Sequence, residues 1–476
     1  MPLPSQAEDF PGWYQEVVRQ ADLAENSLVR GTMVIKPYGF AIWEAIQRAV
    51  DDRIKATGHE NLYFPLFIPY RLLEREAEHV EGFAPEVAVV THAGGEELGE
   101  PLVVRPTSET IIWDTYARWV QSYRDLPLLY NQWANVVRWE LRPRLFLRTT
   151  EFLWQEGHTA HETAEEAIAE TRRMLLECYL DVALRVLAMP VLPGRKSAAE
   201  RFPGAEETLT IEGLMRDRKA LQAGTSHYLG QNFAKAYGVK FLGRDGREEY
   251  AYATSWGVST RLIGGVIMTH GDDRGLRLPP AVAPVQAVLV PIFRTDDERA
   301  RVLLEAERLA RALRDAGIRV RLDDRDGLRP GFKFNEWERK GVPARVEIGP
   351  RDLDAGQVTL ARRDTGEKEP CPIAGAPGRV RTLLDEVQRR LFEDAGAFRD
   401  AHTFRAADYG EMRTLLEEPG GFVVGGWCGG EACETRVKAD TKATIRLLPL
   451  DPEPVEGTCI VCGEPATERA TWAIAY

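Results

Sequence analysis

The sequence predicts an α+β protein of about three domains, and three observations support this prediction. The chain has 476 residues, too many for one compact core. Between residues 102 and 270, short strand patterns do not alternate regularly with helices, which favours an antiparallel sheet. After a proline-rich segment at residues 278–284, a strand–helix–strand rhythm indicates a small α/β domain. We expect domains at residues 1–278, 284–395 and 400–476.

The composition is that of a globular protein. Hydrophobic residues make up 44% of the chain and charged residues 28%, and the absence of a run of eighteen apolar residues argues against a membrane span. The N-terminus lacks the basic start and apolar stretch of a secretory signal, so we expect a cytoplasmic protein. The net charge of −12 argues against nonspecific nucleic-acid binding but leaves room for a local basic surface.

The first domain begins with a helical pattern between Pro37 and Gly58, and Gly58 is placed to end this helix in a left-handed turn. Residues 62–68 follow as a buried strand. Because Pro65 cannot donate to a ladder, we expect this strand at an edge or an interface. The apolar stripe of the helix consists of Ile42, Ile46, Val50 and Ile54, and later helices are predicted at residues 162–187 and 229–237.

The second domain contains a charged helix at residues 296–316. Leu304, Leu309 and Leu313 are predicted to face inward on this helix, and Gly317 is predicted to cap it. The other elements predicted for this domain are strands at residues 287–293, 318–322 and 345–348 and helices at residues 332–340 and 380–393.

One face of the sheet in the first domain carries residue types that suit a nucleotide. Arg138 and Glu140 lie two apart in a strand-like segment, so they point to the same face. A guanidinium binds a phosphate, a carboxylate accepts from the adenine amine, and an aromatic ring stacks on the base. An isolated arginine–x–glutamate pattern is more commonly a solvated surface strand. The next strand places four alternating residues on one face, namely Phe152, Trp154, Glu156 and His158.

A second phosphate contact is predicted at a strand-to-helix junction. Arg261 follows Gly257 there and lies in the first turn of the helix. An arginine in that position can reach a second phosphate. Without its sequence neighbours, Arg261 would be interpreted as a surface charge.

Taken together, these features resemble the three motifs of class II aminoacyl-tRNA synthetases. Those motifs are a helix and strand ending in proline, an arginine–x–glutamate loop with a later phenylalanine, and a glycine-rich strand–helix ending in arginine. Pro65, residues 138–140 with Phe152, and residues 257–261 match them in order. Longer strings resemble prolyl-tRNA synthetases of the archaeal and eukaryotic type, namely RPTSET (105–110), FLWQEGHTAH (152–161), LQAGTSHYLGQNFAKA (221–236) and TSWGVSTRLIGG (254–265).

The resemblance covers essentially the whole chain and implies a proline site. Thr107 and Glu109 would hold the secondary ammonium of proline, which has two N–H donors. Arg138 would bridge the carboxylate of the amino acid and the α-phosphate. For His227, the alternative is a helix-capping or core position. For Trp154 and Trp256, the alternative is a core position. The ring pocket would be lined by Trp154, His227, Ser255 and Trp256.

The resemblance also implies ATP and Mg²⁺ and the activity of a proline–tRNA ligase. The proline carboxylate is already a nucleophile, so Arg138 and Arg261 are predicted to be catalytic through positioning and charge stabilisation. No catalytic base is predicted. The prolyl group would pass from the adenylate to the 3′-terminal adenosine of tRNA(Pro). The residues implied for ATP are Arg138, Glu140, Phe152, Gln222, Thr225, Ser259 and Arg261.

Bacterial-type relatives insert a large editing domain between the second and third motifs. Here fewer than 100 residues separate His161 from Tyr250, so we expect no such insertion. A small pocket rejects a substrate that lacks a methylene by only about 1–3 kcal/mol. We therefore expect some activation of alanine and cysteine, without editing in cis.

Four of the six cysteines lie near the C-terminus. Cys428 and Cys433 form one close pair and Cys459 and Cys462 form a C-x-x-C pair, which fits a structural Zn²⁺ site. Two disulfides or four free thiols are the alternatives, and a cytoplasmic location argues against disulfides. The resemblance also implies a zinc-binding C-terminal domain, although the first pair departs from C-x-x-C. The terminal Tyr476 would reach toward the active site, and a frayed tail is the alternative.

The resemblance identifies residues 284–395 as an α/β anticodon-binding domain. Anticodon bases would be recognised by edge hydrogen bonds and stacking, and a solvated helix face is the alternative for its basic residues. The partners would be tRNA(Pro), L-proline and ATP, in a homodimer formed through the first motif. Two rival functions stay open: a class II synthetase for another amino acid, such as threonine or glycine, and a noncatalytic RNA-binding paralogue. The basic cluster of this domain consists of Lys333, Arg339, Lys340 and Arg345.

Overall fold

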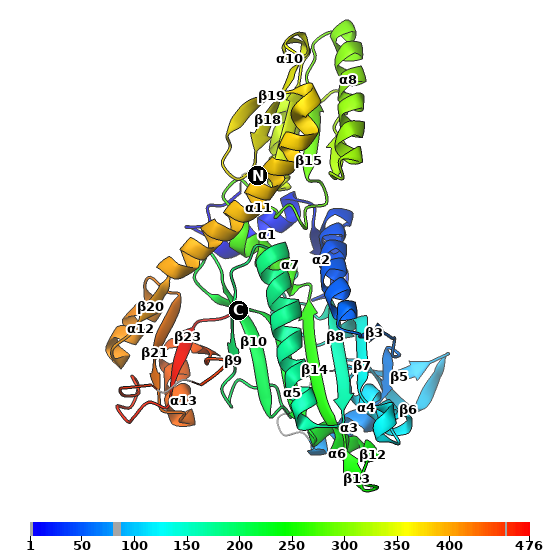
Figure 1. Cartoon of the computed structure of the whole chain (residues 1–476), viewed down its shortest axis with the longest axis vertical. Coiled ribbons are helices and arrows are strands. Elements are labelled where there is room, and N and C mark those ends of the chain that lie inside the picture. Colours follow the sequence, from blue (N-terminus) through cyan, green and yellow to red (C-terminus); the bar gives the residue numbers. More distant parts are fainter. Residues whose placement is uncertain (1–2, 80–86, 453–454) are drawn as a thin grey trace.

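The computed structural model describes residues 3–79, 87–452 and 455–476, arranged in three units that are each built around a β-sheet (Figure 1). The first unit carries the largest sheet, the second lies at the top of Figure 1, and the third lies at its lower left. Helix α11 (Ala376–Ala401) connects the second unit to the third and runs diagonally past the first. Within the described residues, no helix combines the length and apolarity needed to cross a membrane.

The first unit contains a seven-stranded sheet in the order β3-β7-β8-β14-β11-β10-β9. All neighbouring strands are antiparallel except β3 and β7, which are parallel. The sheet confirms the predicted α+β class, with several strands longer than the sequence pattern indicates. The strands are β3 (Glu60–Asn61), β7 (Leu128–Val137), β8 (Glu151–His161), β14 (Tyr252–Ser259), β11 (Ala220–Gly230), β10 (Glu207–Leu214) and β9 (Leu192–Arg195).

Helices cover one face of this sheet. The predicted stripe on α2 is confirmed, because all four of its isoleucine and valine side chains are buried in the same core as Trp256 of β14. Gly58 has a φ of +91°, as the predicted left-handed turn requires. The helix predicted at residues 162–187 is helical from Ala164 to Val186, but it becomes π-helical after Arg173. The helices of this core are α1 (Phe10–Gln20), α2 (Pro37–Ala56), α5 (Ala164–Arg173), η2 (Met174–Leu180), η3 (Val182–Val186) and α7 (Arg261–His270).

Two predictions for the first unit are wrong in part. Residues 62–66 form no strand, although Leu62 and Leu66 each make one backbone hydrogen bond to a neighbouring segment. The strands lie before and after them, in β3 and β4 at the edges of two different sheets. Pro65 lies between those strands, where its missing N–H interrupts a ladder. The helix predicted from residue 229 begins at Asn232, because β11 continues to Gly230.

Smaller elements complete the first unit. A three-stranded sheet has the order β4-β6-β5, and two further pairs are β1-β2 and β12-β13. Their bounds are β4 (Phe67–Pro69), β6 (Glu96–Val104), β5 (Ala88–Ala93), β1 (Ala24–Asn26), β2 (Met33–Ile35), β12 (Lys240–Leu242) and β13 (Glu248–Tyr250), with helices α3 (Tyr70–His79), α4 (Glu109–Trp119), η1 (Tyr123–Asp125) and α6 (Asn232–Tyr237).

The second unit has a five-stranded sheet in the order β16-β15-β17-β18-β19. Strands β15, β16 and β17 are parallel, which confirms the predicted strand–helix–strand rhythm. Leu304 was predicted to face inward but is 53% exposed, because α8 turns its stripe of Val302, Ala306, Leu309 and Leu313 to the core. The elements are β15 (Ala287–Pro291), β16 (Val320–Leu322), β17 (Ala344–Ile348), β18 (Gln357–Arg362), β19 (Lys368–Pro372), α8 (Asp296–Asp315), α9 (Pro330–Arg339), α10 (Pro350–Asp354) and η4 (Ile373–Gly375).

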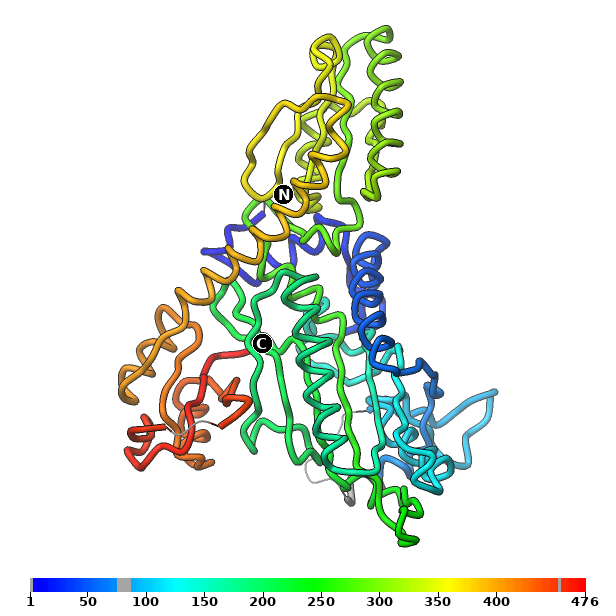
Figure 2. The backbone as a smooth tube through the Cα atoms, in the orientation of Figure 1, coloured from blue at the N-terminus to red at the C-terminus, as the bar shows by residue number. Residues whose placement is uncertain are grey.

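The third unit follows α11 and contains a four-stranded sheet in the order β20-β21-β23-β22. Its edge meets the first unit, because Arg195 of β9 and Leu448 exchange two backbone hydrogen bonds of 2.9 Å. The chain end also returns to the first unit, as Figure 2 shows, and Ala475 pairs with Ala220 of β11. The elements are β20 (Thr403–Arg405), β21 (Phe422–Trp427), β22 (Thr444–Leu447), β23 (Glu468–Ala473), α12 (Tyr409–Glu417) and α13 (Glu431–Thr441).

Candidate active site

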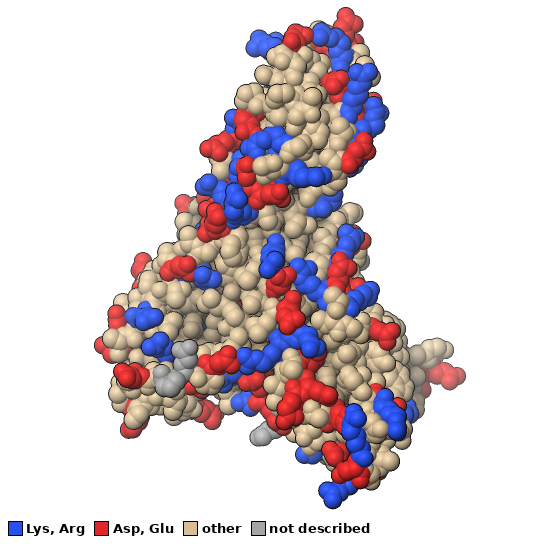
Figure 3. All heavy atoms as spheres, viewed as in Figure 1, with Lys and Arg blue, Asp and Glu red and all other residues tan. Residues whose placement is uncertain are grey.

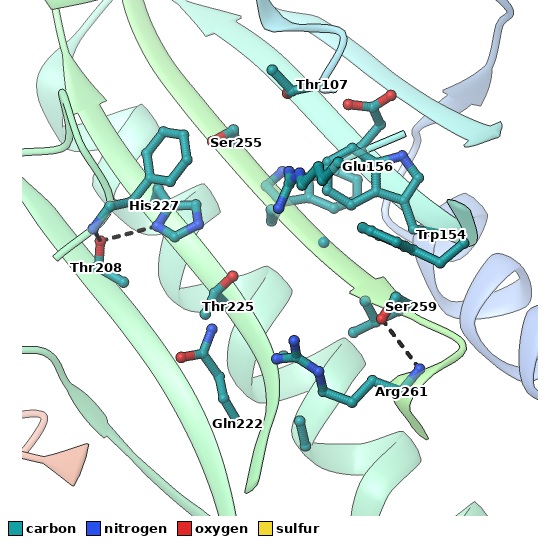
Figure 4. Close-up of a pocket in the computed structure, with 18 of the residues that line it drawn as sticks. Thr107, Trp154, Glu156, Thr208, Gln222, Thr225, His227, Ser255, Ser259 and Arg261 are labelled. Carbon is teal, nitrogen blue, oxygen red and sulfur yellow. Dashed lines mark hydrogen bonds between the residues drawn. The ribbon is translucent and has the colours of Figure 1, made fainter. Parts of the chain in front are cut away.

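A cavity of about 480 Å³ lies over the sheet of the first unit, on the side away from the α5 and η2 layer. Every residue predicted to bind proline or ATP lines this cavity. Figure 4 shows Gln222, Thr225 and His227 along one strand, with Thr107 and Trp154 across the cavity from them and Arg261 at one end. Residues that lie more than 150 positions apart in the sequence therefore share one surface.

Strand register produces this surface. In one row, His158 of β8 lies opposite Ser255 of β14, and Ser255 lies opposite His227 of β11. Gly257 occupies the middle of the next row, where a Cβ atom would come within 2.9 Å of a carbonyl oxygen of β8. A residue with a side chain at that position would push against the neighbouring strand.

Arg138 lies just after β7 rather than within a strand, which corrects the strand-like segment predicted for it and Glu140. Its Nε donates a 2.9 Å hydrogen bond to the carbonyl of Pro106, and its guanidinium lies 5.2 Å from the ring centre of Trp154 and 5.7 Å from that of Phe152. The surrounding protein atoms lower the pKa of Arg138, although the side chain stays open to the cavity. Its fixed guanidinium is ready to bind an anion.

Arg261 begins α7 at the other end of the cavity. Its backbone N–H donates to Ser259 Oγ at 3.2 Å, and its Nε donates to the Leu147 carbonyl at 3.2 Å. Burial, together with the charges of Arg148 and Arg138, lowers the pKa of Arg261 to about 10. Two arginines thus face one cavity, and a bound polyanion would relieve their mutual repulsion.

Glu140 is held within its own loop. Its carboxylate accepts a 2.8 Å hydrogen bond from the Arg142 backbone N–H and forms an ion pair of 3.6 Å with Arg148. It lines the cavity, so these contacts fix a carboxylate at the rim.

Thr107 and Glu109 are both buried at the wall facing β11. Glu109 is the first residue of α4, and its carboxylate accepts a hydrogen bond from the Thr107 hydroxyl. The hydroxyl oxygen and the carboxylate keep further lone pairs for a ligand with two N–H donors. This arrangement suits a cyclic ammonium.

Glu156 forms a buried hydrogen-bond network beneath these acceptors. Its carboxylate accepts from the Ser108 hydroxyl at 2.5 Å, from Gln132 Nε2 at 2.8 Å and from His158 Nε2 at 3.0 Å. Burial favours the neutral carboxyl, but the hydrogen bonds and the charge of His158 outweigh it and lower the pKa of Glu156. For His158, burial would lower the pKa, but Glu156 and the charge of Glu109 raise it.

His227 lies in β11 and lines the cavity, so the helix-capping alternative for it is wrong. A 3.0 Å hydrogen bond links His227 Nδ1 to Thr208 Oγ1 (Figure 4). The ring of Phe202 lies 4.6 Å from the imidazole, at an angle of 30°. Burial and the nearby charge of His158 lower the pKa of His227 to about 3, so the imidazole is neutral at physiological pH.

The two tryptophans differ. Trp154 points to the cavity beside Arg138. Trp256 is 2% exposed, and its ring packs on the opposite face of the sheet, 5.2 Å from the His59 ring and 6.4 Å from the Tyr179 ring. The core alternative therefore describes the Trp256 side chain, and only other atoms of this residue reach the cavity wall.

The four C-terminal cysteines form a compact cluster. Their sulfur atoms all lie within 4.8 Å of one another, and pairs involving Cys428 and Cys433 are 3.7–3.9 Å apart. All six cysteines lie in the described part of the chain and are free, so the disulfide alternative is wrong. Four thiolates bound to one Zn²⁺ at about 2.3 Å would be separated by about 3.8 Å, so the cluster fits a tetrahedral metal site.

Tyr476 is fixed rather than frayed. Its hydroxyl donates to Asp217 at 2.7 Å, and its backbone N–H donates to the Ala220 carbonyl at 3.2 Å. Its ring lies 5.9 Å from the Arg144 guanidinium, in the loop that follows β7. Tyr476 lines a separate small cavity beside that loop and does not line the large one.

The basic cluster predicted in the second unit is mostly engaged in contacts within the protein. Lys333 is only 3% exposed and its ammonium donates to the Asp323 carbonyl at 2.9 Å, so it contributes neither to a basic surface nor to a solvated helix face. Arg345 pairs with Glu347, and Lys340 lies over the Tyr38 ring. On the face in Figure 3, lysines and arginines lie among aspartates and glutamates over this unit.

Sequence reasoning assigned no ligand role to one part of the cavity wall. Residues 196–202 connect β9 toward β10, and this segment contributes Lys196, Glu200, Arg201 and Phe202 to the cavity. It contains no periodic pattern, so the sequence held no signal for its position. The role of Glu156 in the hydrogen-bond network could have been predicted from the sequence, because strand alternation placed this residue on the same face as the site.

Comparisons with known proteins agree along the chain. Residues 90–270 match the family "tRNA synthetase class II core domain (G, H, P, S and T)", residues 286–383 match "Anticodon binding domain", and residues 409–476 match "Prolyl-tRNA synthetase, C-terminal". The chain is 54% identical to a proline–tRNA ligase of Porphyromonas gingivalis, over 100% of this chain and 99% of the relative. It is 56% identical to that of Salinibacter ruber, over 98% of each chain. A crystal structure of prolyl-tRNA synthetase from Cryptosporidium parvum, complexed with halofuginone and AMPPNP, is 39% identical and superposes with a TM-score of 0.94 over 100% of this chain and 97% of that one.

Proposed function

The chain belongs to the prolyl-tRNA synthetase family, and we propose that its large cavity activates L-proline with ATP and then transfers the prolyl group to tRNA(Pro). In the first step, a carboxylate oxygen of proline bonds to the α-phosphorus, the bond from that phosphorus to the β-phosphate breaks, and pyrophosphate leaves. In the second step, a ribose hydroxyl of the 3′-terminal adenosine loses its proton and attacks the prolyl carbonyl carbon, and AMP leaves.

The observation that carries this proposal is that one cavity is lined by a hydroxyl and a carboxylate that can accept hydrogen bonds and by two arginines. Thr107 and Glu109 accept from the ammonium of proline, and Arg138 contacts its carboxylate and the α-phosphate. Arg261 contacts a second phosphate. Because the carboxylate needs no activation, the protein accelerates the reaction by positioning and by stabilising charge on the transferred group.

The remaining lining residues divide between the two substrates. His227, Trp154 and Ser255 surround the proline ring, and the low pKa of His227 keeps it from acting as a general acid near neutral pH. Trp256 contributes to the wall without presenting its ring. We assign the adenosine to the other end of the cavity, where it would contact Phe152, Glu140, Gln222, Thr225 and Ser259.

Two metals belong to the proposal. Mg²⁺ would enter with ATP, neutralising phosphate charge that the arginines leave exposed. Zn²⁺ would be held by Cys428, Cys433, Cys459 and Cys462 in a closed four-sulfur site with a structural role. Such a site gives the third unit a metal-dependent fold.

Each of the three units has its own role in the proposed reaction with tRNA(Pro). We propose that residues 284–395 bind the anticodon of tRNA(Pro), that residues 1–278 catalyse both steps and that residues 400–476 carry the zinc site. We propose a cytoplasmic homodimer formed through the first motif. Large apolar side chains are exposed around that motif, which supports the dimer; they include Leu28, Val29, Val34, Phe40, Tyr63 and Phe67.

The cavity alone would discriminate among amino acids. Residues between the second and third motifs form α5, η2, η3, α6 and strands β9 to β13, and most of their buried apolar side chains belong to two hydrophobic cores of the first unit. We therefore propose that alanine and cysteine are activated to some degree and that this chain does not clear them. Deacylation of alanyl-tRNA far above the uncatalysed rate would contradict this.

Amino-acid-dependent pyrophosphate exchange with ATP tests the proposed function, with proline compared with alanine, cysteine, threonine and glycine. Proline should lead by orders of magnitude. Exchange led by threonine or glycine would indicate a class II synthetase of another specificity. Exchange with none of them would favour the noncatalytic RNA-binding alternative, which the retained Arg138, Arg261, Thr107 and Glu109 argue against.

A further inference from the structure

The third unit meets the first beside the wall of the active-site cavity. Strand β9 pairs with Leu448 of the third unit through Arg195, and the next residues, 196–202, form the cavity wall. We call residues 196–202 the wall segment. In Figure 1, the third unit lies along the β9 edge of the large sheet. The wall segment is therefore placed between the substrate site and the third unit.

A buried ion cluster crosses this junction. Glu212 of β10 is fully buried, and its carboxylate accepts hydrogen bonds of 3.0–3.1 Å from the guanidinium of Arg446, which belongs to β22. Lys196 donates to the same carboxylate at 2.7 Å and to the Arg446 carbonyl at 3.1 Å. Arg446 thus holds the Lys196 ammonium in two ways, directly through its own carbonyl oxygen and indirectly through the carboxylate of Glu212.

Helix α13 makes a second set of contacts with the wall segment. Glu434 is 4% exposed, and its carboxylate accepts a 2.6 Å hydrogen bond from the Ser197 hydroxyl. One turn further on, Lys438 forms an ion pair of 3.6 Å with Glu200, which is also 3.7 Å from Arg446. Glu434 directly follows Cys433, so the cysteine cluster and this contact share one rigid turn.

The far end of the wall segment touches the proposed amino-acid pocket. The backbone N–H of Phe202 donates to Thr208 Oγ1 at 3.1 Å, and Thr208 is hydrogen-bonded to His227. The Phe202 ring also lies against the His227 ring. A displacement of residues 196–202 would therefore move a wall of the site that contacts the substrate ring.

We propose that Arg446 is a positioning residue for the amino-acid site, acting with Glu434 to hold the wall segment against His227. This inference rests on the proposed function. A buried ion cluster contributes little net stability compared with well-packed apolar residues, but it imposes one geometry on the groups that it joins. Neither residue lines the cavity, so their effect on substrate passes through Lys196 and Ser197. The third unit thus shapes the proline site without lining it.

The test is pyrophosphate exchange with Arg446→Met, using Arg469→Met as the matched control. Arg469 is exposed on β23 of the same sheet. We expect Arg446→Met to raise the KM for proline at least tenfold, with kcat and the KM for ATP within threefold of wild type. An unchanged KM for proline would overturn the inference, and so would equal changes in the KM values of both substrates.

If Arg446→Met does not fold, a double-mutant cycle of Ser197→Ala and Glu434→Ala tests whether contacts from the third unit position the wall segment. Each variant should raise the KM for proline several-fold, and the double variant should not exceed the larger single effect, because both remove the same hydrogen bond. Fully additive or absent effects would overturn the inference. Failure of the proposed function is a different result: wild type and Arg469→Met would then show no proline-dependent exchange.

Discussion

Replacing Glu156 with glutamine tests the hydrogen-bond network beneath the site. Each carboxylate oxygen of Glu156 accepts two hydrogen bonds, one oxygen from the Ser108 hydroxyl and Gln132, the other from the Ser108 backbone N–H and His158. A glutamine amide would turn its own NH₂ group toward the Gln132 amide donor in one orientation and toward the Ser108 backbone N–H in the other, so at least one hydrogen bond is lost either way. A hydrogen bond to a charged group contributes about 1.5–3 kcal/mol, so this loss should lower Tm by roughly 3–12 °C.

Scanning calorimetry measures this effect, with Glu151→Gln as the control. Glu151 begins the same strand but is exposed, and its carboxylate accepts a hydrogen bond from Asn135, so its substitution should shift Tm by less than about 2 °C. The pKa of Glu156 is lowered from 4.5, so its charged form stabilises the fold above that pH and this stability is lost as pH falls through the lower value. The difference between wild type and Glu156→Gln should therefore shrink in acid. A Glu156→Gln variant that melts with wild type at pH 7 would refute the network.

Four further outcomes are expected. Arg261→Ala should lower proline-dependent exchange by about 10²–10³-fold, because it removes the phosphate contact that we propose for this side chain; exchange kinetics measure this, and a loss under tenfold would contradict the assignment. Gly157→Ala should destabilise the fold by about 1–3 kcal/mol or more in urea unfolding, because its Cβ would lie 2.1 Å from the Trp256 ring. The KM for proline, measured from pH 5.5 to 8, should show no inflection from His227, since its pKa of about 3 keeps it neutral throughout. An inflection in that range that disappears in His227→Gln would show that His227 titrates there. Cys459→Ser should lose bound zinc, measured as metal per chain by mass spectrometry, whereas wild type retains one equivalent.

Local periodicity was enough to predict helices that carry one regular apolar stripe. The stripe on α2 repeats every four residues and is buried as expected. Leu304 shows where this reasoning fails, because α8 is rich in alanine and arginine and the core selects Val302 and Ala306 instead of a larger leucine two positions away. Two residues on a helix that are two positions apart point about 200° apart, so both cannot face one core.

The site was predictable to the extent that its residues stand in recognisable strings. Those strings, together with the arginine–x–glutamate motif at residues 138–140, named every residue predicted to bind proline or ATP, and all of them line one cavity. The orientation of Trp256 was not predictable, because the string does not say which face of β14 meets the helices. The wall segment was missed because its position depends on Arg446 and Glu434, which lie more than 200 residues away in the sequence.

The continuity of α11 constrains how the two appended units can move. This helix has 26 residues, which corresponds to a rod about 39 Å long. Along its length Gln388 donates to carbonyl oxygens of η3, and Arg399 donates to the Pro190 carbonyl. An unbroken rod resists bending and twisting, so a force applied at the second unit acts on the third through a lever rather than a flexible tether. A rotation of the second unit would therefore transmit force through α11 to the contact between the third unit and β9. Binding at the second unit could in this way displace the wall segment of the amino-acid pocket.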